Sequence, residues 1–269
     1  MNITFIGGGN MAAALIGGLI VKGHAASGIR VVELQAEARA RLAAQFGVVC
    51  MESAVAPLGE AVVLAVKPQQ MRAAAAALRP HLDHELVITI AAGIRLVDLS
   101  RWLGGYATLV RCMPNTPALI GAGISGLYAS AAVAAGQRDL ADSILGAVGA
   151  TLWVPEEGML DPVTAISGSG PAYVFYFVEA MQRAAQEMGF SAAEARKLAV
   201  ETFVGAARLA AQSTEEVALL RERVTSKGGT TERALASMEA DRVKDLIVQA
   251  LHAANQRAHE LGEQLGAAE

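Results

Sequence analysis

Two segments, far apart in the chain, carry the residues whose types and spacing could do chemistry. The first, FIGGGNMAAAL at residues 5–15, fits the pattern G-x-G-x-x-A with Gly7, Gly9 and Ala12. Gly7 would make a tight turn, Gly9 would let backbone approach a pyrophosphate, and Ala12 would let a helix pack closely on the preceding strand. The positive helix start would hold the phosphates. The segment predicts a dinucleotide site, formed by Ile6, Gly7, Gly8, Gly9, Asn10, Met11 and Ala12.

The second segment, VTSKGGTTERAL at residues 224–235, interrupts a stretch that otherwise favours helix. Gly229 or Thr230 could simply cap the following helix, with Glu232 in its first turn. A cap needs one such residue, whereas hydroxyls and glycines gather here. Together with free N–H groups at a helix start they would bind a small carboxylate. Lys227 could add attraction, although a solvated lysine fits equally well.

Three more segments follow apolar strands and would meet at one sheet edge, where doubly wound folds bind ligands. In LAVKPQ, Lys67 is pushed to an extended conformation by Pro68, which can begin a helix. ITIAAGI supplies small residues that admit a flat ring, and RCMPNTPAL fixes Asn115 between prolines. Turn chemistry alone could explain each. We expect the cofactor to contact Ala65, Val66, Lys67, Pro68, Ala91, Ala92, Gly93 and Asn115.

Glu33 ends the second strand, about 20 residues after the glycine segment. A carboxylate there can accept from the ribose 2′-hydroxyl and repel a 2′-phosphate, which favours NADH. Arg39 and Arg41 lie just beyond and could reach a phosphate, or simply form a solvated helix face. The cofactor is therefore expected to be NADPH or NADH, and the residues leave the choice open.

Composition excludes several classes of protein. The 269 residues are 53% hydrophobic and 18% charged, with a net charge of -4, so no basic surface for nucleic acid is expected. The apolar run from Met11 to Val21 is too short to span a bilayer and has no cationic leader. Cys50 and Cys112 form no CxxC pair, and the five histidines do not cluster, so no metal site is expected. A cytoplasmic enzyme without membrane contact is the default.

The elements that must position these residues follow two patterns. Apolar runs alternate with helical stretches in the first half, which predicts an α/β fold with a Rossmann-like, doubly wound parallel sheet. Expected strands are 3–6, 30–33, 61–66, 86–90, 108–113, 122–128 and 151–154, and expected helices of this half are 11–21, 37–45, 69–78, 96–103 and 137–148. From residue 159 only helices are expected, over 172–188, 192–212, 215–223, 231–238 and 243–265. The predicted domains are 1–158, for the dinucleotide, and 159–269, all-helical, for dimerisation and substrate.

The helix EARKLAVETFVGAARLAAQ is small or apolar around most of its circumference, so it must be buried on several sides. About 110 helical residues cannot easily surround it, and we therefore expect a homodimer. ISGSGPAY, at residues 166–173, resembles a nucleotide loop, but close helix packing explains its glycines equally well.

The ordered set FIGGGNMA, AVKPQ, AAG, RCMPNTP, ISGSGPAY and VTSKGGTT resembles pyrroline-5-carboxylate reductase over nearly the whole chain. The resemblance implies that 1-pyrroline-5-carboxylate, a cyclic imino acid, is reduced to L-proline by hydride transfer from NAD(P)H to the C=N bond. This is the last step of proline biosynthesis. It also implies dimers with interleaved C-terminal helices, often assembled five to a ring as a decamer. The substrate residues it implies are Val224, Ser226, Gly229, Thr230 and Thr231, with Thr231 catalytic beside the imine nitrogen.

Hydride addition to a cyclic imine needs a protonated or hydrogen-bonded nitrogen, not a metal or a covalent nucleophile, and an iminium carries its own electrophilicity, so a hydroxyl donor can suffice. One departure concerns Glu33, because NADPH-preferring members usually carry a small polar residue there. Two rivals remain: a 3-hydroxyacid-type dehydrogenase and a non-catalytic cofactor-binding protein. The first would use a lysine early in the helical half, yet residues 172–188 contain none and Lys197 is expected to be exposed.

Overall fold

The computed structural model describes residues 1–267, which form two compact units. The first contains Met1–Ser169 and the chain from Ala254 onward, and the second contains Gly170–Ala253. The division falls later than the predicted boundary near residue 158. Leu160 is fully buried, and a Cβ on Gly126 in the sheet would lie 3.2 Å from its side chain, so the segment after residue 158 packs on the sheet.

The first unit is built on one eight-stranded sheet in the order β3-β2-β1-β4-β5-β6-β7-β8. All neighbouring strands are parallel except β6 and β7, which are antiparallel. The strands are β1 (Ile3–Ile6), β2 (Ile29–Val32), β3 (Val49–Met51), β4 (Ala61–Leu64), β5 (Leu86–Thr89), β6 (Leu109–Met113), β7 (Gly123–Ala129) and β8 (Gly149–Trp153). The seven predicted strands are present with ends shifted by a few residues, and β3 at the sheet edge was not predicted.

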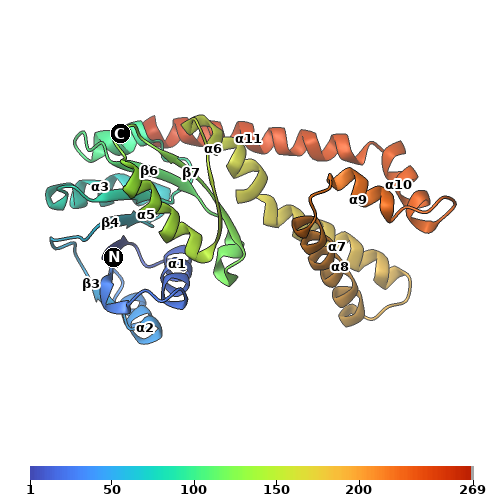
Figure 1. Cartoon of the computed structure of the whole chain (residues 1–269), viewed down its shortest axis with the longest axis horizontal. Helices are drawn as coiled ribbons and strands as arrows, with labels where there is room; N and C mark the ends of the chain where they lie inside the picture. The colour runs from blue at the N-terminus through green and yellow to red at the C-terminus, as the bar shows by residue number, and fades with distance from the viewer. Residues whose placement is uncertain (268–269) are drawn as a thin grey trace. The chain divides into compact units, whose positions relative to one another are not determined.

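Both faces of the sheet are covered by helices, as Figure 1 shows. Ile3 and Phe5 of β1 belong to one buried cluster and Ile6 to the other, so side chains alternate between two cores. This explains why the parallel strands are apolar throughout. The α-helices of this unit are α1 (Asn10–Val21), α2 (Ala36–Phe46), α3 (Met71–Leu78), α4 (Leu96–Trp102), α5 (Ala135–Leu145) and α6 (Leu160–Val163). Short 3₁₀ turns cover Ala26–Gly28, Pro68–Gln70, Arg79–His81, Thr116–Ile120, Gly146–Val148 and Glu157–Met159, and a π-helical turn covers Thr164–Gly168.

The second unit is helical and contains α7 (Gly170–Glu187), α8 (Ala192–Gln212), α9 (Val217–Arg223) and α10 (Thr230–Ala240). The last helix, α11 (Val243–Ala267), begins in the second unit and ends in the first. At the start of α8, Ser191 and Glu194 form a capping box, with the Glu194 carboxylate 2.9 Å from the Ser191 N–H.

Helix α8 is poorly covered within one chain. Only Ala195 and Ala199 of its residues are buried, while Leu198 is 50% and Leu209 57% exposed. On α7, Tyr176 is 71% exposed. This is the all-round apolar helix for which the sequence predicted a partner subunit. Within residues 1–267, no helix combines the length and the hydropathy that a bilayer crossing requires.

Candidate functional site

The glycine loop between β1 and α1 is shaped by three glycines with three different surroundings. Gly7 has φ +98°, and a Cβ there would lie 2.9 Å from the Ala65 carbonyl oxygen. A Cβ on Gly8 would lie 2.5 Å from Leu42 in α2. Gly9 has an ordinary extended backbone, and a Cβ there would meet nothing within 4 Å. The chain itself therefore gives no steric reason for a glycine at position 9, whereas a pyrophosphate lying against the backbone does.

Helix α1 begins at this loop without a side-chain cap. Gly9 is the N-cap residue, and within residues 1–267 no side chain accepts from the first-turn N–H groups. The first helical bond runs from the Ala13 N–H to the Gly9 carbonyl, 2.9 Å. Ala12 is 1% exposed and packs in the core under the sheet, as the pattern predicted. The exposed Asn10 and the half-buried Met11 leave the helix start accessible to an anion.

Glu33 follows β2 and turns its carboxylate back to the glycine loop. Oε2 accepts from the Gly8 N–H at 2.9 Å, and Oε1 accepts from the Gln35 N–H at 2.9 Å. The guanidinium of Arg39 hydrogen-bonds to the backbone: its Nη1 donates to the carbonyl oxygens of Glu33, at 2.7 Å, and Leu34, at 2.8 Å. Of the two arginines considered from the sequence, Arg39 is thus tied to backbone, and Arg41 is exposed on α2. A fixed negative charge stands where the ribose hydroxyls of a bound dinucleotide are expected.

The carboxyl ends of β1, β4 and β5 are joined to one another by backbone hydrogen bonds. Ala65 N–H donates to the Ile6 carbonyl at 2.8 Å, and Ile90 N–H donates to the Leu64 carbonyl at 3.2 Å. The predicted residues after these strands therefore lie side by side with the glycine loop. Val66, Lys67 and Pro68 follow Ala65, with Lys67 exposed, and Ala91, Ala92 and Gly93 follow β5, with Ala92 exposed.

Asn115, which follows β6, is 9% exposed, and its side chain is used by the chain itself. Its Oδ1 accepts from the Ile124 N–H at 2.9 Å, and its Nδ2 donates to the Ser167 carbonyl at 3.1 Å. The amide thus ties the loop after β6 to β7 and to the π-helical turn. One amide hydrogen remains, so the contact with the nicotinamide half stays a prediction.

The second predicted segment lies in the second unit, between α9 and α10. Gly229 is the N-cap of α10, without a side-chain cap, which leaves the first-turn N–H groups free. The loop is shaped by Gly228, with φ +73°, and by the Gly229 N–H, which donates to the Ser226 carbonyl at 3.0 Å. Within residues 1–267, the hydroxyls of Ser226, Thr230 and Thr231 make no hydrogen bond, although Thr231 is half-buried. Val224, the C-cap of α9, is 61% exposed.

Sequence reasoning missed two features around these sites. Glu232 was seen only as a first-turn acid, but its carboxylate accepts from the Gly228 N–H at 2.6 Å and so holds the loop closed. The π-helical turn, which contains the first three residues of ISGSGPAY, was also missed. A Cβ on Gly168 in that turn would lie 2.5 Å from the Met113 Cε, so close packing accounts for this glycine. Gly168 lies between Ser167 and Ser169, so its flanks carried no apolar signal for this packing.

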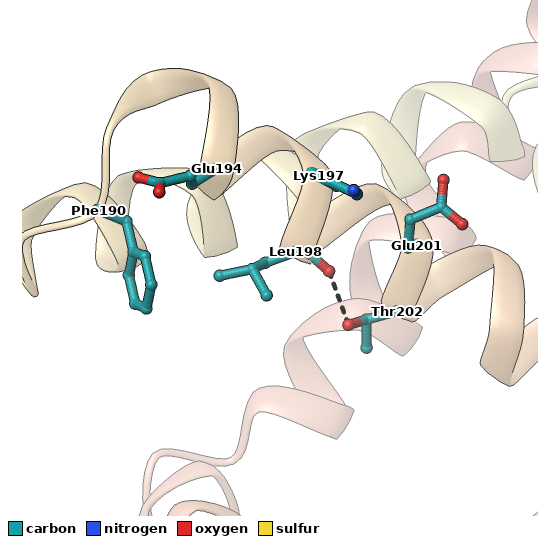
Figure 2. Close-up of a pocket in the computed structure, with 6 residues that line it drawn as sticks. All are labelled: Phe190, Glu194, Lys197, Leu198, Glu201 and Thr202. Carbon is teal, nitrogen blue, oxygen red and sulfur yellow. Dashed lines mark hydrogen bonds between the residues drawn. The ribbon is translucent and has the colours of Figure 1, made fainter.

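Other parts of the surface do not carry predicted site residues. Figure 2 shows a pocket formed by side chains of α8 and by Phe190, two residues before this helix, where Lys197 is exposed as expected. Its lining consists of Phe190, Glu194, Lys197, Leu198, Glu201 and Thr202. In the part of the chain that the structure describes, no three His, Cys, Asp or Glu side chains are grouped to hold a metal ion.

A glycine loop and an uncapped helix start at the carboxyl ends of parallel strands, followed by a helical unit, define a two-domain protein of the Rossmann dinucleotide-binding class. Residues 2–93 match the family model "NADP oxidoreductase coenzyme F420-dependent". Residues 157–261 match "Pyrroline-5-carboxylate reductase dimerisation".

The pyrroline-5-carboxylate reductase of Pseudomonas aeruginosa is 50% identical over 98% of both chains, and that of Haemophilus influenzae is 42% identical over 96% of this chain and 97% of its own. This chain belongs to the pyrroline-5-carboxylate reductase family.

Solved structures agree with this assignment. The pyrroline-5-carboxylate reductase of Coxiella burnetii is 40% identical and superposes with a TM-score of 0.92, covering 97% of this chain and 98% of its own. The Plasmodium falciparum enzyme, solved with NADP bound, is 26% identical with a TM-score of 0.86 and the same coverage. The Rossmann fold and the helical C-terminal region predicted from the sequence are confirmed.

Proposed function

We propose that this chain reduces the C=N bond of 1-pyrroline-5-carboxylate to give L-proline, using NAD(P)H, as the final step of proline biosynthesis. The observation that carries the proposal is the start of α10, where three hydroxyls without partners in residues 1–267 adjoin free helix N–H groups. These groups suit an amino-acid carboxylate and a ring nitrogen. The family assignment supports the same reaction.

The residues divide between cofactor and substrate as follows. When bound, NAD(P)H would supply a hydride to the imine carbon, and the ring nitrogen would gain one proton from solvent as the C=N bond becomes a C–N bond. The glycine loop and the start of α1 hold the pyrophosphate. Ala65–Pro68, Ala91–Gly93 and Asn115 line the nicotinamide half. Ser226, Gly229 and Thr230 bind the carboxylate, Val224 contacts the apolar ring, and the Thr231 hydroxyl donates a hydrogen bond to the imine nitrogen.

A hydroxyl in this role is chemically sufficient. The carbon of a C=N bond becomes more electrophilic when its nitrogen accepts a hydrogen bond, so the reaction does not need the Lys or His acid that a ketone would require. Helix α7, where a 3-hydroxyacid dehydrogenase would carry its lysine, contains none. No observation favours that rival.

The test is a pair of substitutions at Thr231. Because the loss of one positioned hydrogen-bond donor to a reacting group costs roughly 100- to 1,000-fold, Thr231→Ala is expected to lower kcat/KM for the imino acid by about 100-fold or more. Thr231→Ser keeps the hydroxyl and should stay within about tenfold of the wild type. The matched control is Thr225→Val, because that hydroxyl is already bonded to the Arg221 carbonyl, 2.7 Å. Unchanged kinetics of Thr231→Ala would remove this residue from the site, and a wild type that oxidises neither cofactor would refute the reaction.

We infer that NADH is the preferred cofactor. Support comes from the Glu33 carboxylate, which is fixed by the N–H groups of Gly8 and Gln35, and from the commitment of Arg39 to backbone carbonyls. A 2′-phosphate would meet this carboxylate without a free guanidinium on Arg39 to offset the charge.

We also propose a homodimer, with assembly to a decamer as the larger form implied by the resemblance. The exposed apolar side chains of α7 and α8 and the matched dimerisation region support the dimer. Light scattering should give twice the chain mass of 27.8 kDa, or ten times it for the ring, and a stable monomer would refute both. The cytoplasm remains the compartment that the composition predicts.

A further inference from the structure

The end of α11 packs directly against the loop after β5, inside the first unit. Gly93 in this loop is buried and has φ +75°. A Cβ on Gly93 would lie 2.8 Å from Cδ1 of Leu265 and 3.6 Å from the Gly262 nitrogen. Leu265 is half-buried and packs on the core cluster that contains Ala91 and Ile94. One side chain of the last helix thus supports the loop from behind.

Polar contacts fix the helix in this position. Arg95, two residues after Gly93, donates from Nη2 to the His259 carbonyl at 3.3 Å, and Arg101 donates from Nη2 to the Gly266 carbonyl at 2.8 Å. Cations suit the carbonyl end of a helix. A Cβ on Gly262 would lie 2.9 Å from Arg95 Nε, so the glycine lets the guanidinium lie close against the helix. The helix and the loop are therefore held at close range.

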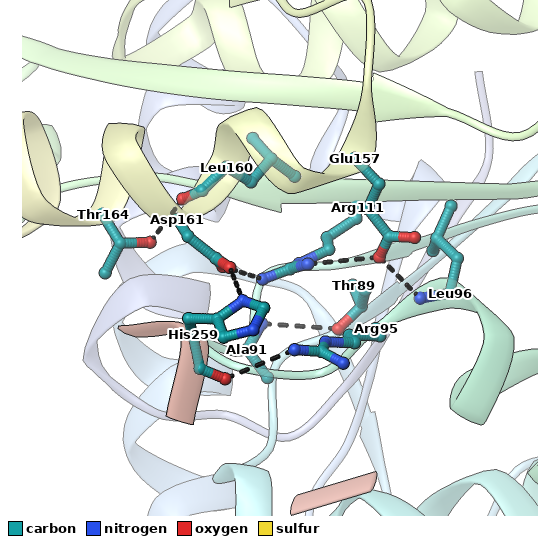
Figure 3. Close-up of polar contacts among 10 residues, drawn as sticks. All are labelled: Thr89, Ala91, Arg95, Leu96, Arg111, Glu157, Leu160, Asp161, Thr164 and His259. Carbon is teal, nitrogen blue, oxygen red and sulfur yellow. Dashed lines mark hydrogen bonds and ion pairs between the residues drawn. The ribbon is translucent and has the colours of Figure 1, made fainter. Parts of the chain in front are cut away.

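A buried charge network secures the other side of the same loop, as Figure 3 shows. Arg111 of β6 is 4% exposed, and its guanidinium lies 3.1 Å from Glu157 and 3.4 Å from Asp161. Glu157 also accepts from the Leu96 N–H at 2.7 Å, where the loop enters α4. Asp161 lies 3.4 Å from Nδ1 of His259 on α11. Charged hydrogen bonds thus connect β6, α4 and α11 around the loop.

We propose that the end of α11 is a positioning element for the reaction, with Leu265 as the positioning residue that sets the loop Ala91–Gly93. The inference rests on the proposed function, in which this loop lines the nicotinamide half. A displacement of about 1 Å in a reacting group can cost about 100-fold in rate. Gly93 has no side chain to anchor the loop, so Leu265 supplies the packing that a side chain of the loop would otherwise provide.

The experiment compares Leu265→Ala with Leu265→Met and with a control, Leu261→Ala, one turn earlier on the same helix. Leu261 is 37% exposed, and its atom nearest to a Cβ on Gly93 is the backbone carbonyl carbon, which alanine keeps, so the control removes the same side-chain atoms without removing that contact. NADH affinity is measured by its fluorescence, and hydride transfer by the kinetic isotope effect with cofactor deuterated at the transferred position. For Leu265→Ala we expect at least a fivefold rise in the NADH Kd, a tenfold fall in kcat and a larger isotope effect. The imino-acid KM should stay within twofold.

Leu265→Met refills the space and should restore Kd and kcat, and Leu261→Ala should match the wild type. If Leu265→Ala folds but keeps the wild-type Kd, kcat and isotope effect, the positioning role is refuted. It is also refuted if Leu261→Ala shows the same losses. Should Leu265→Ala not fold, Arg95→Gln serves instead, since it loses the charged contact to the His259 carbonyl and leaves the core intact. NADH binding is measured without the imino acid and therefore does not depend on the proposed reaction. A wild-type protein that binds NADH but reduces no imine would refute the proposed function, whereas the positioning role is tested by the NADH Kd of the variants.

Discussion

The charge at Glu33 gives the sharpest quantitative prediction, because the structure fixes its carboxylate against the Gly8 and Gln35 N–H groups. Glu33→Gln keeps the shape and one acceptor oxygen but removes the charge. Two unit charges 4 Å apart repel by about 1 kcal/mol in water and about 4 kcal/mol near a protein surface. Glu33 is half-buried, so relief of the repulsion should be worth at least about 1.4 kcal/mol, or tenfold, for NADPH.

The same substitution should weaken NADH slightly. The ribose hydroxyl would then donate to a neutral amide oxygen and no longer to a carboxylate, which costs about 1 kcal/mol, or roughly fivefold in NADH affinity. The ratio of kcat/KM for NADPH to that for NADH should therefore rise by about 50-fold in total, mostly through KM. Steady-state assays with both cofactors at one imino-acid concentration measure it.

A control variant and a change of ionic strength test whether the charge of Glu33 causes the change in the ratio. Glu37→Gln removes an equal charge from the exposed first turn of α2, and no contact ties it to the glycine loop, so it should leave the ratio within about twofold. Higher ionic strength should raise the wild-type ratio toward that of Glu33→Gln, because salt screens the repulsion. A ratio that stays constant in Glu33→Gln, or moves equally in Glu37→Gln, would refute the role of this carboxylate.

The remaining predictions concern backbone, buried charge and pH. Gly9→Ala should change the free energy of unfolding by less than about 1 kcal/mol and still lower NADH affinity more than tenfold. Gly7→Ala should instead lower the free energy of unfolding in urea by about 1–3 kcal/mol or more, because Gly7 has a φ of +98°. Arg111→Met should cost about 3–5 kcal/mol in the same assay, since it leaves the Asp161 carboxylate buried without its guanidinium; a loss below 1 kcal/mol would contradict the network. Burial, followed by the charges of Glu85 and Asp83, raises the pKa of Tyr106 to about 12, so its contribution to stability is complete below about pH 10 and is lost as pH rises through about 12. Phenolate absorbance should lose a step near pH 12 in Tyr106→Phe, and a wild type in which all tyrosines ionise near pH 10 would contradict this assignment.

The sheet was predictable because its strands are buried on both faces. Val62 and Val63 are fully buried in opposite clusters, so their segment had to be apolar at successive positions. Strand β3 was not predicted because it has only three residues and lies at the edge of the sheet, where Val49 is 50% exposed. A short, half-exposed strand has neither the apolar run nor the alternation that sequence reasoning uses.

The network behind the loop after β5 could not have been predicted. Arg111 meets partners 46 and 50 residues away, and their geometry depends on how α6 packs on the sheet. From the sequence alone, the arginine in LVRCM could be exposed to solvent, form an ion pair or bind a ligand. The domain division falls late because the segment of α6 packs on the sheet, and the return of α11 to the first unit depends likewise on contacts of Leu265 that no local pattern records.

The three glycines were predicted as one motif, but in the structure each position favours glycine for a different physical reason. Gly7 is required by its φ and by the Ala65 carbonyl, while the buried Leu42 side chain leaves little room for a Cβ on Gly8, so both positions favour glycine in this fold even without a ligand. Gly9 is not required by the chain, but open space alone does not identify a ligand, since Gly136 and Gly205 are equally open. What distinguishes Gly9 is its place as the uncapped start of α1 at the carboxyl ends of parallel strands. The inference of a bound phosphate therefore depends on the combination of an unneeded glycine and unpaired helix N–H groups, and Gly9→Ala tests that combination without disturbing the fold.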